Sequence, residues 1–252
     1  MANRMKGRTV LVTGAGSGIG RAIAELLGAE GAWVACVDRN LSAVERVATS
    51  LVHGARAIQA DVSCEPEVQA ALAVVEKERG TLDVLINNAG IAGPQTPVGT
   101  TPLDQWQRTL DVNLTGTFLF CKHAMPLLIA ARGNIVNVAS ALALVAKTDE
   151  AAYHASKAGV VHLSKSMALD YATTVRVNCV CPGAVRTPMI ESVLPQGVDV
   201  ATALAEYGRI HPLHQRLAEP IEIANAVLFL ASADASLITG VALAVDAGYS
   251  AG

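Results

Sequence analysis

The sequence predicts an α/β fold, in which a doubly wound, Rossmann-type parallel sheet of about seven strands is flanked by helices. Short β-branched segments alternate with longer helical patterns along the chain. Most of these short segments are continuously apolar, as expected for strands that helices cover on both faces. No linker-like stretch or internal repeat divides the 252 residues. We therefore expect one domain over residues 1–252.

Each element is expected where its pattern is clearest. Strands are predicted for TVLVT (9–13), WVACV (33–37), ARAIQA (55–60), LDVLI (82–86), NIVNVA (134–139), VRVNCV (175–180) and VALAV (241–245). Helical patterns occupy 18–29, 41–52, 65–79, 103–131, 153–172 and 220–232, the last opening on Glu219–Pro220. The stretch 185–218 interrupts the alternation with several prolines and glycines. Because long excursions from compact α/β chains are usually functional or mobile, we expect a lid over the substrate there.

Composition argues against several classes of function. The net charge is −3, the pI is about 6.1, and no basic stripe is present, so no nucleic-acid partner is expected. Apolar runs such as 22–27 and 139–146 are shorter than a membrane span, and the first residues lack the pattern of a secretory signal. The five cysteines are scattered, which favours buried thiols over a zinc site. We expect a cytoplasmic protein with no membrane partner and no metal.

A glycine motif follows the first predicted strand. Gly14, Gly18 and Gly20 form G-x-x-x-G-x-G at the point where the strand gives way to a helix. Glycines there allow a tight turn and a close approach of the backbone to a pyrophosphate, which the helix N-terminus then faces. Taken alone, the motif also fits a strand–helix turn that binds nothing.

Asp38 ends the second predicted strand, 18 residues after Gly20. A carboxylate at that position would accept hydrogen bonds from an adenosine ribose and would repel a 2′-phosphate. It therefore favours NAD over NADP. The neighbouring Arg39 points the other way, because an arginine there can hold such a phosphate.

Tyr153 and Lys157 lie one helical turn apart in YHASK, so their side chains should project from the same face. An ammonium group beside a phenol favours the phenolate and lowers its pKa. A tyrosine tuned in this way can exchange a proton with an alcohol or a carbonyl oxygen. On its own, Y-x-x-x-K is more often a solvated helix face.

Further motifs occur in the same order along the chain: Asp61–Val62, NNAG (Asn87–Gly90), Asn113 in DVNLTG, Ser140, and PGAVRTP (Pro182–Pro188). With the glycine turn and YHASK, they make the chain resemble the classical short-chain dehydrogenases/reductases over nearly its whole length. The resemblance implies hydride transfer to or from a nicotinamide cofactor.

The resemblance also implies roles for four residues. Tyr153 would be the general acid and base, and Lys157 would lower its pKa and hydrogen-bond the nicotinamide ribose. Ser140 would hold the substrate oxygen. Asn113, in the middle of a helix, would anchor a water that relays protons to Lys157.

The cofactor would contact Asp38 and residues from five of the motifs. Asp61 would meet the adenine amino group, Val62 would pack on the ring, and Thr187 would contact the carboxamide. The full implied set is Gly14, Ser17, Gly18, Ile19, Gly20, Asp38, Asp61, Val62, Asn87, Ala89, Gly90, Tyr153, Lys157, Pro182, Gly183, Val185 and Thr187.

The substrate would be bound by Ser140, Leu142, Tyr153, Met189 and Tyr207. Because this set is largely apolar, we expect a small hydrophobic secondary alcohol or diol, or its ketone. An anionic substrate would need a cation, for which Arg186 and Arg209 are the nearby candidates. His211 and His214 are expected at the surface or in a loop.

Two other functions compete with this one. A 3-oxoacyl-thioester reductase would use NADPH, against which Asp38 argues, as does Ser17 where many NADPH users carry a basic residue. A dinucleotide sensor without catalysis should lack part of the set formed by Asn113, Ser140, Tyr153 and Lys157.

The two longest predicted helices, 103–131 and 153–172, carry more apolar positions than one sheet face can cover. These positions include Leu114, Phe118, Phe120, Val160, Val161 and Leu163. Since the family commonly forms tetramers on these helices, we expect a homotetramer, with a dimer as the alternative.

Overall fold

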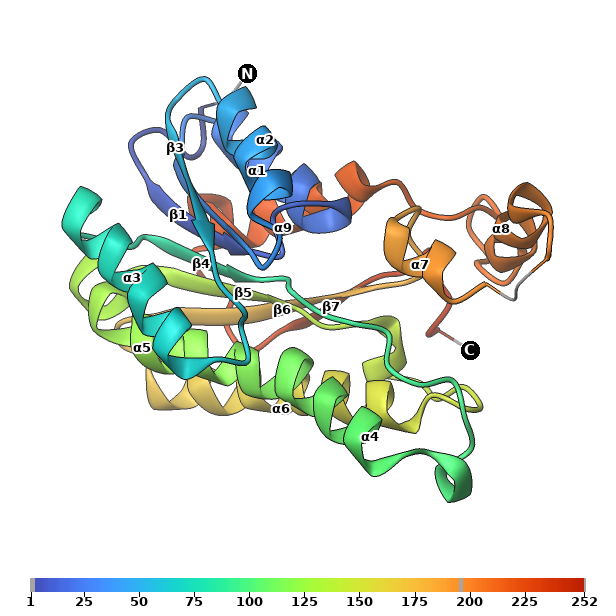
Figure 1. The fold of residues 1–252 in the computed structure, drawn as a ribbon. Coiled ribbons are helices and arrows are strands. Elements are labelled where there is room, and N and C mark those ends of the chain that lie inside the picture. The colour runs from blue at the N-terminus through green and yellow to red at the C-terminus, as the bar shows by residue number, and fades with distance from the viewer. Residues whose placement is uncertain (1–2, 195–196, 252) are drawn as a thin grey trace.

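The computed structural model describes residues 3–194 and 197–251. Over these residues the chain forms one seven-stranded sheet, in which every strand pair is parallel, as the sequence predicts (Figure 1). The strands are β1 (Thr9–Thr13), β2 (Trp33–Asp38), β3 (Ala55–Gln59), β4 (Val84–Asn87), β5 (Asn134–Val138), β6 (Arg176–Pro182) and β7 (Ala242–Val245). β6 runs two residues further than expected because it keeps pairing with β7 as far as Pro182 and Val245.

The helices form a layer on each face of the sheet, so the molecule has three layers (Figure 1). One face carries α1 (Gly18–Ala29), α2 (Leu41–Ser50) and α9 (Pro220–Ala231). The other carries α3 (Glu65–Arg79), α5 (Gly116–Ala131) and α6 (Ala151–Asp170), with α4 (Leu103–Leu110) beyond them. This arrangement explains why the strands are apolar on both sides.

The strand order is β3-β2-β1-β4-β5-β6-β7. The chain runs outward from β1 in one direction and, after crossing over, outward from β4 in the other. β1 pairs with both β2 and β4, so the order reverses between β1 and β4. In sheets of this kind ligands bind beyond the carboxyl ends of the strands at such a reversal. The topology alone therefore directs attention to the segments that follow β1 and β4.

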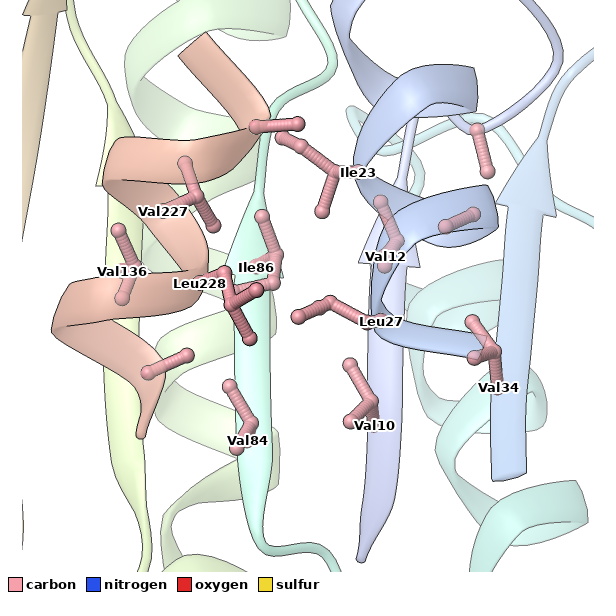
Figure 2. Packing of buried hydrophobic residues seen from close by; sticks show 14 of the residues in the cluster. Val10, Val12, Ile23, Leu27, Val34, Val84, Ile86, Val136, Val227 and Leu228 are labelled. Carbon is pink, nitrogen blue, oxygen red and sulfur yellow. The ribbon is translucent and has the colours of Figure 1, made fainter. Parts of the chain in front are cut away.

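The core beneath α1 and α9 shows how these helices are fixed to the sheet (Figure 2). Ile23 and Leu27 of α1 and Leu228 of α9 are fully buried. They point toward the valines and isoleucine of β1 and β4 labelled in the figure. Each fully buried side chain of this size contributes about 1.5–3 kcal/mol relative to exposure. This packing sets the position of the α1 N-terminus above the end of β1.

The predicted helix over 103–131 is continuous, but one of its turns is wider than the rest. α4 passes through a π-helical turn, Asp111–Thr115, into α5. Such turns are rare and frequently lie at functional sites. This one contains Asn113. By length and composition the whole segment could cross a membrane. A core helix of the same length passes that test as well, and Phe120 and Leu128 are fully buried against the sheet.

The interruption expected at 185–218 is present and is closed at its base. Val185 and Ala218 form an isolated parallel bridge, and the Ala218 amide donates to Ala184 O at 3.0 Å. Between them the chain forms α7 (Pro188–Ser192) and α8 (Val200–Arg209), which follow the carboxyl end of β6 (Figure 1). The sequence did not predict these two helices. Residues 195 and 196 of the expected lid lie outside the described residues.

Candidate active site

A cavity of about 390 Å³ lies beyond the carboxyl ends of the strands. One end is lined by Gly14, Asp38 and Asp61, and the other by Ser140, Tyr153 and Tyr207. The volume falls in the range of small-molecule and cofactor sites. The cavity therefore joins the two groups of residues that the sequence assigns to a dinucleotide and to a substrate.

The glycine turn at the first end has backbone angles and close contacts that residues with a side chain would not tolerate. Gly14 and Gly18 have φ values of +64° and +52°, in the left-handed region. A Cβ on Gly20 would overlap the Gly14 carbonyl oxygen and the Asn88 side-chain nitrogen. Gly20 therefore does not line the cavity but allows the turn to close beneath it.

The turn also presents a helix N-terminus to the cavity. Ser17 is the N-cap of α1, and its side chain makes no capping hydrogen bond within the described structure. The first amides of a helix have no partner inside the helix. With Ser17, Gly18 and Ile19 lining the cavity, these amides and the positive end of the helix dipole fit an anion such as a diphosphate.

Asp38 is held in one orientation at the cavity wall. Its two carboxylate oxygens accept hydrogen bonds from the Gly16 amide at 3.0 Å and from the Asn40 amide at 2.9 Å. A fixed carboxylate next to the glycine turn suits a pair of ribose hydroxyls, which can donate to it. Arg39 also lines this part of the cavity.

Asp61 lines the cavity next to Val62, as expected, and has a partner that the sequence did not reveal. Arg108 of α4 donates to Asp61 Oδ2 at 3.1 Å and to Ser63 Oγ at 2.9 Å. Burial raises the pKa of Asp61, but hydrogen bonds from Ser63 and Arg108 outweigh it and hold the pKa below its usual range. Asp61 is thus an ionised hydrogen-bond acceptor.

The NNAG segment differs from expectation at one position. Asn87, predicted to flank the cofactor, is buried, and its Nδ2 donates to Asn137 Oδ1 at 2.9 Å. Among the described residues it is Asn88, with Ala89 and Gly90, that lines the cavity. Successive residues of a strand point to opposite sides, so Asn87 at the end of β4 turns away from the cavity. Asn88 instead donates to Thr13 O at 3.0 Å and braces the glycine turn.

The base of the lid lies against the same turn. A Cβ on Gly18 would come within 3.1 Å of Thr187 Cγ2, so the chain after β6 packs directly on the glycine turn. Pro182, Gly183, Val185 and Thr187, all expected to contact the cofactor, line the cavity.

Ser140, Tyr153 and Lys157 meet where β5 ends and α6 begins. The Ser140 hydroxyl accepts from the Leu142 amide at 3.1 Å. Lys157 is only 4% exposed, its Nζ donates to Val138 O at 2.9 Å, and it lies 5.8 Å from the centroid of the Tyr153 ring. All three residues line the cavity, as the sequence predicts.

The ionisation of this group corrects one expectation. The sequence predicts that Lys157 lowers the pKa of Tyr153, yet burial raises the pKa of Tyr153 to about 12. A nearby Ser140 hydroxyl lowers it and the charge of Glu150 raises it, both by less. Burial also lowers the pKa of Lys157 to about 8. Lys157 does not offset the rise in the pKa of Tyr153, because its ammonium is directed to the Val138 carbonyl rather than to the phenol oxygen.

This burial makes the stability of the free protein depend on pH. The pKa of Lys157 is about 8 when folded and about 10.4 when unfolded, so the unfolded chain binds more protons between these values. Stability from this residue therefore increases as pH rises. We expect the free energy of unfolding of wild type, relative to Lys157→Met, to rise by on the order of 2 kcal/mol between pH 8 and 10.

Urea unfolding at several pH values measures this change. Lys77→Met, which removes an exposed lysine of α3, should run parallel to wild type. If the free energies of unfolding of wild type and Lys157→Met differed by the same amount at every pH, the lysine could not be buried without a neutralising partner.

Asn113 fixes the loop behind Lys157. Its Nδ2 donates to Ile91 O at 2.9 Å and to Ser156 Oγ at 3.0 Å, and its Oδ1 accepts from the Ile91 amide at 2.8 Å. The side chain is fully buried and, in the described structure, lies outside the cavity lining. A Cβ on Gly90 would lie 3.2 Å from Asn113 Oδ1 and 3.4 Å from Lys157 Nζ. Asn113 thus supports Lys157 through Gly90 and Ile91, and the water relay stays a prediction.

The far end of the cavity holds the expected substrate residues Leu142, Met189 and Tyr207. Neither Arg186 nor Arg209, both in the described part of the chain, lines it, and Arg186 pairs with Glu219 at 3.0 Å. The charged side chains at this end are instead Lys147 and Glu150.

His211, expected at the surface or in a loop, does lie in the loop that follows α8, but it is only 3% exposed and lines the cavity. Its Nε2 accepts from the Ala184 amide at 2.9 Å, and its Nδ1 lies 3.0 Å from Tyr207 O. Because a carbonyl only accepts, the proton is on Nδ1 and the ring is neutral. The histidine joins the lid to the end of β6. Its ring stacks on the Tyr249 ring, with 5.3 Å between the ring centroids.

Sequence reasoning missed several residues that line the cavity, and apart from Asn88 in NNAG they lie outside the motifs. These are Asn88, Arg108, Lys147, Glu150, His211 and Tyr249. Lys147 and Glu150 lie just beyond Leu142 in the loop that precedes Tyr153, so their proximity was the one available hint.

Comparison with known proteins places these features in a family. The family model described as enoyl-(acyl carrier protein) reductase matches residues 14–250. The chain is 42% identical to cis-4-hydroxycyclohexanecarboxylate dehydrogenase of Sinomonas cyclohexanicum, over 97% of each chain. It is 37% identical to cyclohexanol dehydrogenase of an Acinetobacter species, over 99% of this chain and 97% of the other. The crystal structure of levodione reductase superposes with a TM-score of 0.94 at 33% identity, covering 98% of each chain.

The names of these relatives and the geometry of the site imply the same chemistry. The glycine turn and the α1 N-terminus suit a dinucleotide, and Ser140, Tyr153 and Lys157 suit proton exchange with an oxygen at the other end of the same cavity. Similarity that extends over almost the entire length includes every one of these segments. The chain belongs to the short-chain dehydrogenase/reductase family and is a nicotinamide-dependent oxidoreductase that acts on CH–OH groups.

Proposed function

We propose that the protein is an NAD(H)-dependent oxidoreductase that interconverts a small hydrophobic secondary alcohol or diol and its ketone. The observation that carries this proposal is the cavity that connects Asp38 and the glycine turn to Ser140, Tyr153 and Lys157. Relatives named for cyclohexanol and for a hydroxycyclohexanecarboxylate support a cyclic substrate.

The protein residues manage the proton and the oxygen. In ketone reduction the Tyr153 phenol, protonated at neutral pH because burial raises its pKa, donates its proton to the carbonyl oxygen. In alcohol oxidation the phenolate accepts the hydroxyl proton. Ser140 holds the oxygen in both directions, and the ammonium of Lys157 stabilises the phenolate. The nicotinamide, when bound, accepts or supplies the hydride.

The preference for NAD rests on Asp38. Its carboxylate is fixed by two amides, so it cannot easily move away from a 2′-phosphate placed beside it. The repulsion of two anions at such a site lowers affinity for NADP. Arg39 is the residue through which NADP would be bound if the preference were reversed.

Absorbance of the reduced nicotinamide tests the proposal. We expect wild type to oxidise cyclohexanol with NAD, and to give a kcat/KM at least about tenfold lower with NADP. A 3-oxoacyl thioester with NADPH tests the competing reductase function. Turnover of the thioester with NADPH and of no alcohol with NAD would contradict the proposal.

We also propose a cytoplasmic homotetramer built on α4, α5 and α6. Phe120, Val160 and Val161, which were expected to favour assembly, are buried within the protomer and give no support. Apolar side chains remain exposed on the same helices: Leu103 at 78%, Phe118 at 45% and Leu169 at 81%. Light scattering after size exclusion should give four times the 26.0 kDa chain mass, and a monomer would contradict assembly.

A further inference from the structure

Two charged side chains that have no assigned role, Lys147 and Glu150, line the substrate end of the cavity. Lys147 Nζ donates to Glu150 Oε1 at 2.9 Å, and both residues line the cavity. The side chain of Glu150 is 12% exposed and that of Lys147 is 37% exposed. A charged pair so close to the reacting groups needs an explanation, because burying charges costs free energy unless their hydrogen bonds are satisfied.

The lid keeps this pair in place. Lys147 Nζ lies 5.4 Å from the centroid of the Tyr207 ring on α8, within the range of a cation–π interaction. Lys147 therefore contacts both the lid and the loop after β5. Glu150 uses one of its three N–H donors and the Tyr207 ring face occupies another, which leaves one donor for a further acceptor.

The pair is close to the position of the chemistry. Glu150 immediately precedes α6, three residues before Tyr153, which is about one turn. Burial is the main cause of the raised pKa of the Tyr153 phenol, and the negative charge of Glu150 adds a smaller contribution in the same direction. A small substrate whose oxygen lies at Tyr153 and Ser140 would thus have its neighbouring carbons near Lys147 and Glu150.

The chemistry of the pair selects one kind of substrate group. A donor next to an acceptor matches a hydroxyl, which accepts from the ammonium and donates to the carboxylate. A carboxylate would gain from Lys147 but would be repelled by Glu150 at nearly the same distance. An alkyl carbon would leave both charges without a further partner.

We propose that Lys147 and Glu150 bind a second hydroxyl of the substrate and make the enzyme selective for diols over simple alcohols. This proposal rests on the proposed alcohol oxidation and specifies its substrate class. It assigns the pair a role in specificity, while Ser140 and Tyr153 act on the reacting oxygen.

Steady-state kinetics with NAD tests the proposal. The substrates are cyclohexanol, the 1,2-, 1,3- and 1,4-cyclohexanediols, and cis-4-hydroxycyclohexanecarboxylate. Wild type should prefer at least one diol over cyclohexanol in kcat/KM by about tenfold or more, since hydrogen bonds to charged groups have effects of that order. Lys147→Met and Glu150→Gln should each reduce this ratio toward one.

Lys77→Met, the same change on the exposed surface of α3, should keep the ratio of wild type. A diol preference that survives both cavity variants, or its absence in wild type, would show that the pair only ties the lid to the loop. A preference for the hydroxy acid that Lys147→Met abolishes would make Lys147 a carboxylate site instead. Each of these three results overturns the diol proposal while leaving alcohol oxidation intact, whereas a wild type inactive on all five substrates contradicts the proposed function itself.

Discussion

Replacing Tyr153 with phenylalanine is expected to lower kcat/KM for alcohol oxidation by roughly 10²–10⁴, the usual contribution of general acid–base catalysis. The change removes one oxygen atom and keeps the ring, so the cavity and its remaining contacts should be preserved. What is lost is the group that exchanges the proton with the reacting oxygen. Stopped-flow or steady-state measurements of the absorbance of the reduced nicotinamide give the size of the effect.

Tyr171 provides a matched control, because it immediately follows the same helix and, within the described residues, lies outside the cavity lining. Tyr171→Phe should keep the rate of wild type. Binding of the reduced cofactor, followed by its fluorescence, should be nearly unchanged in Tyr153→Phe. A Tyr153→Phe enzyme with more than a tenth of wild-type kcat/KM would remove Tyr153 from the proton transfer.

Gly20→Ala is expected to destabilise the protein by about 3 kcal/mol or more and to abolish dinucleotide binding. The added Cβ would overlap the Gly14 carbonyl, which is backbone and cannot rotate away. The Asn88 side chain in the same place is itself held by Thr13 O and Gly14 O. Overpacking against fixed atoms costs at the upper end of the usual 1–3 kcal/mol. For a chain of this length the melting temperature should fall by roughly 6–12 °C.

Gly99→Ala is the control, since a Cβ there would meet no described atom within 4 Å and the backbone is not left-handed. Its melting temperature should stay within about 2 °C of wild type. Thermal unfolding and fluorescence titration with the reduced cofactor measure both variants. A Gly20→Ala protein that melts and binds like wild type would mean that the turn can open without cost.

The fold could be predicted because its signals are local and repeated. The apolar strands, the helices between them and the glycine turn each specify a short segment. α3 shows how such signals agree: Pro66 and two acidic residues lie in its first turn, two basic residues lie in its last turn, and Gly80 ends it with φ of +71°. Its predicted and observed bounds are identical. The lid helices were missed because prolines and glycines are frequent in this stretch and are read as helix breakers. Pro188 instead begins α7, and Gly208 lies in the last turn of α8.

The parts of the site that could not be predicted depend on where side chains point and how deeply they are buried, rather than on residue type. The sequence NNAG does not show whether Asn87 or Asn88 faces the cavity, because successive side chains of a strand point to opposite sides. YHASK places Lys157 beside Tyr153 but does not show that desolvation exceeds their attraction. Arg108 and His211 meet the site across 47 and 27 residues of sequence separation, from Asp61 and Ala184 respectively. Only the packed structure brings such partners together.

A crystal structure of the wild-type enzyme with NADH and cyclohexanol would show whether one cavity holds both the cofactor and the reacting oxygen, because reduced cofactor and alcohol form a complex that cannot react. We expect a dinucleotide along the cavity with its diphosphate at Gly18 and Ile19. We also expect the alcohol oxygen to lie within about 3.2 Å of both Tyr153 Oη and Ser140 Oγ. An alcohol oxygen bound away from Tyr153, or a dinucleotide bound outside this cavity, would contradict the proposed site.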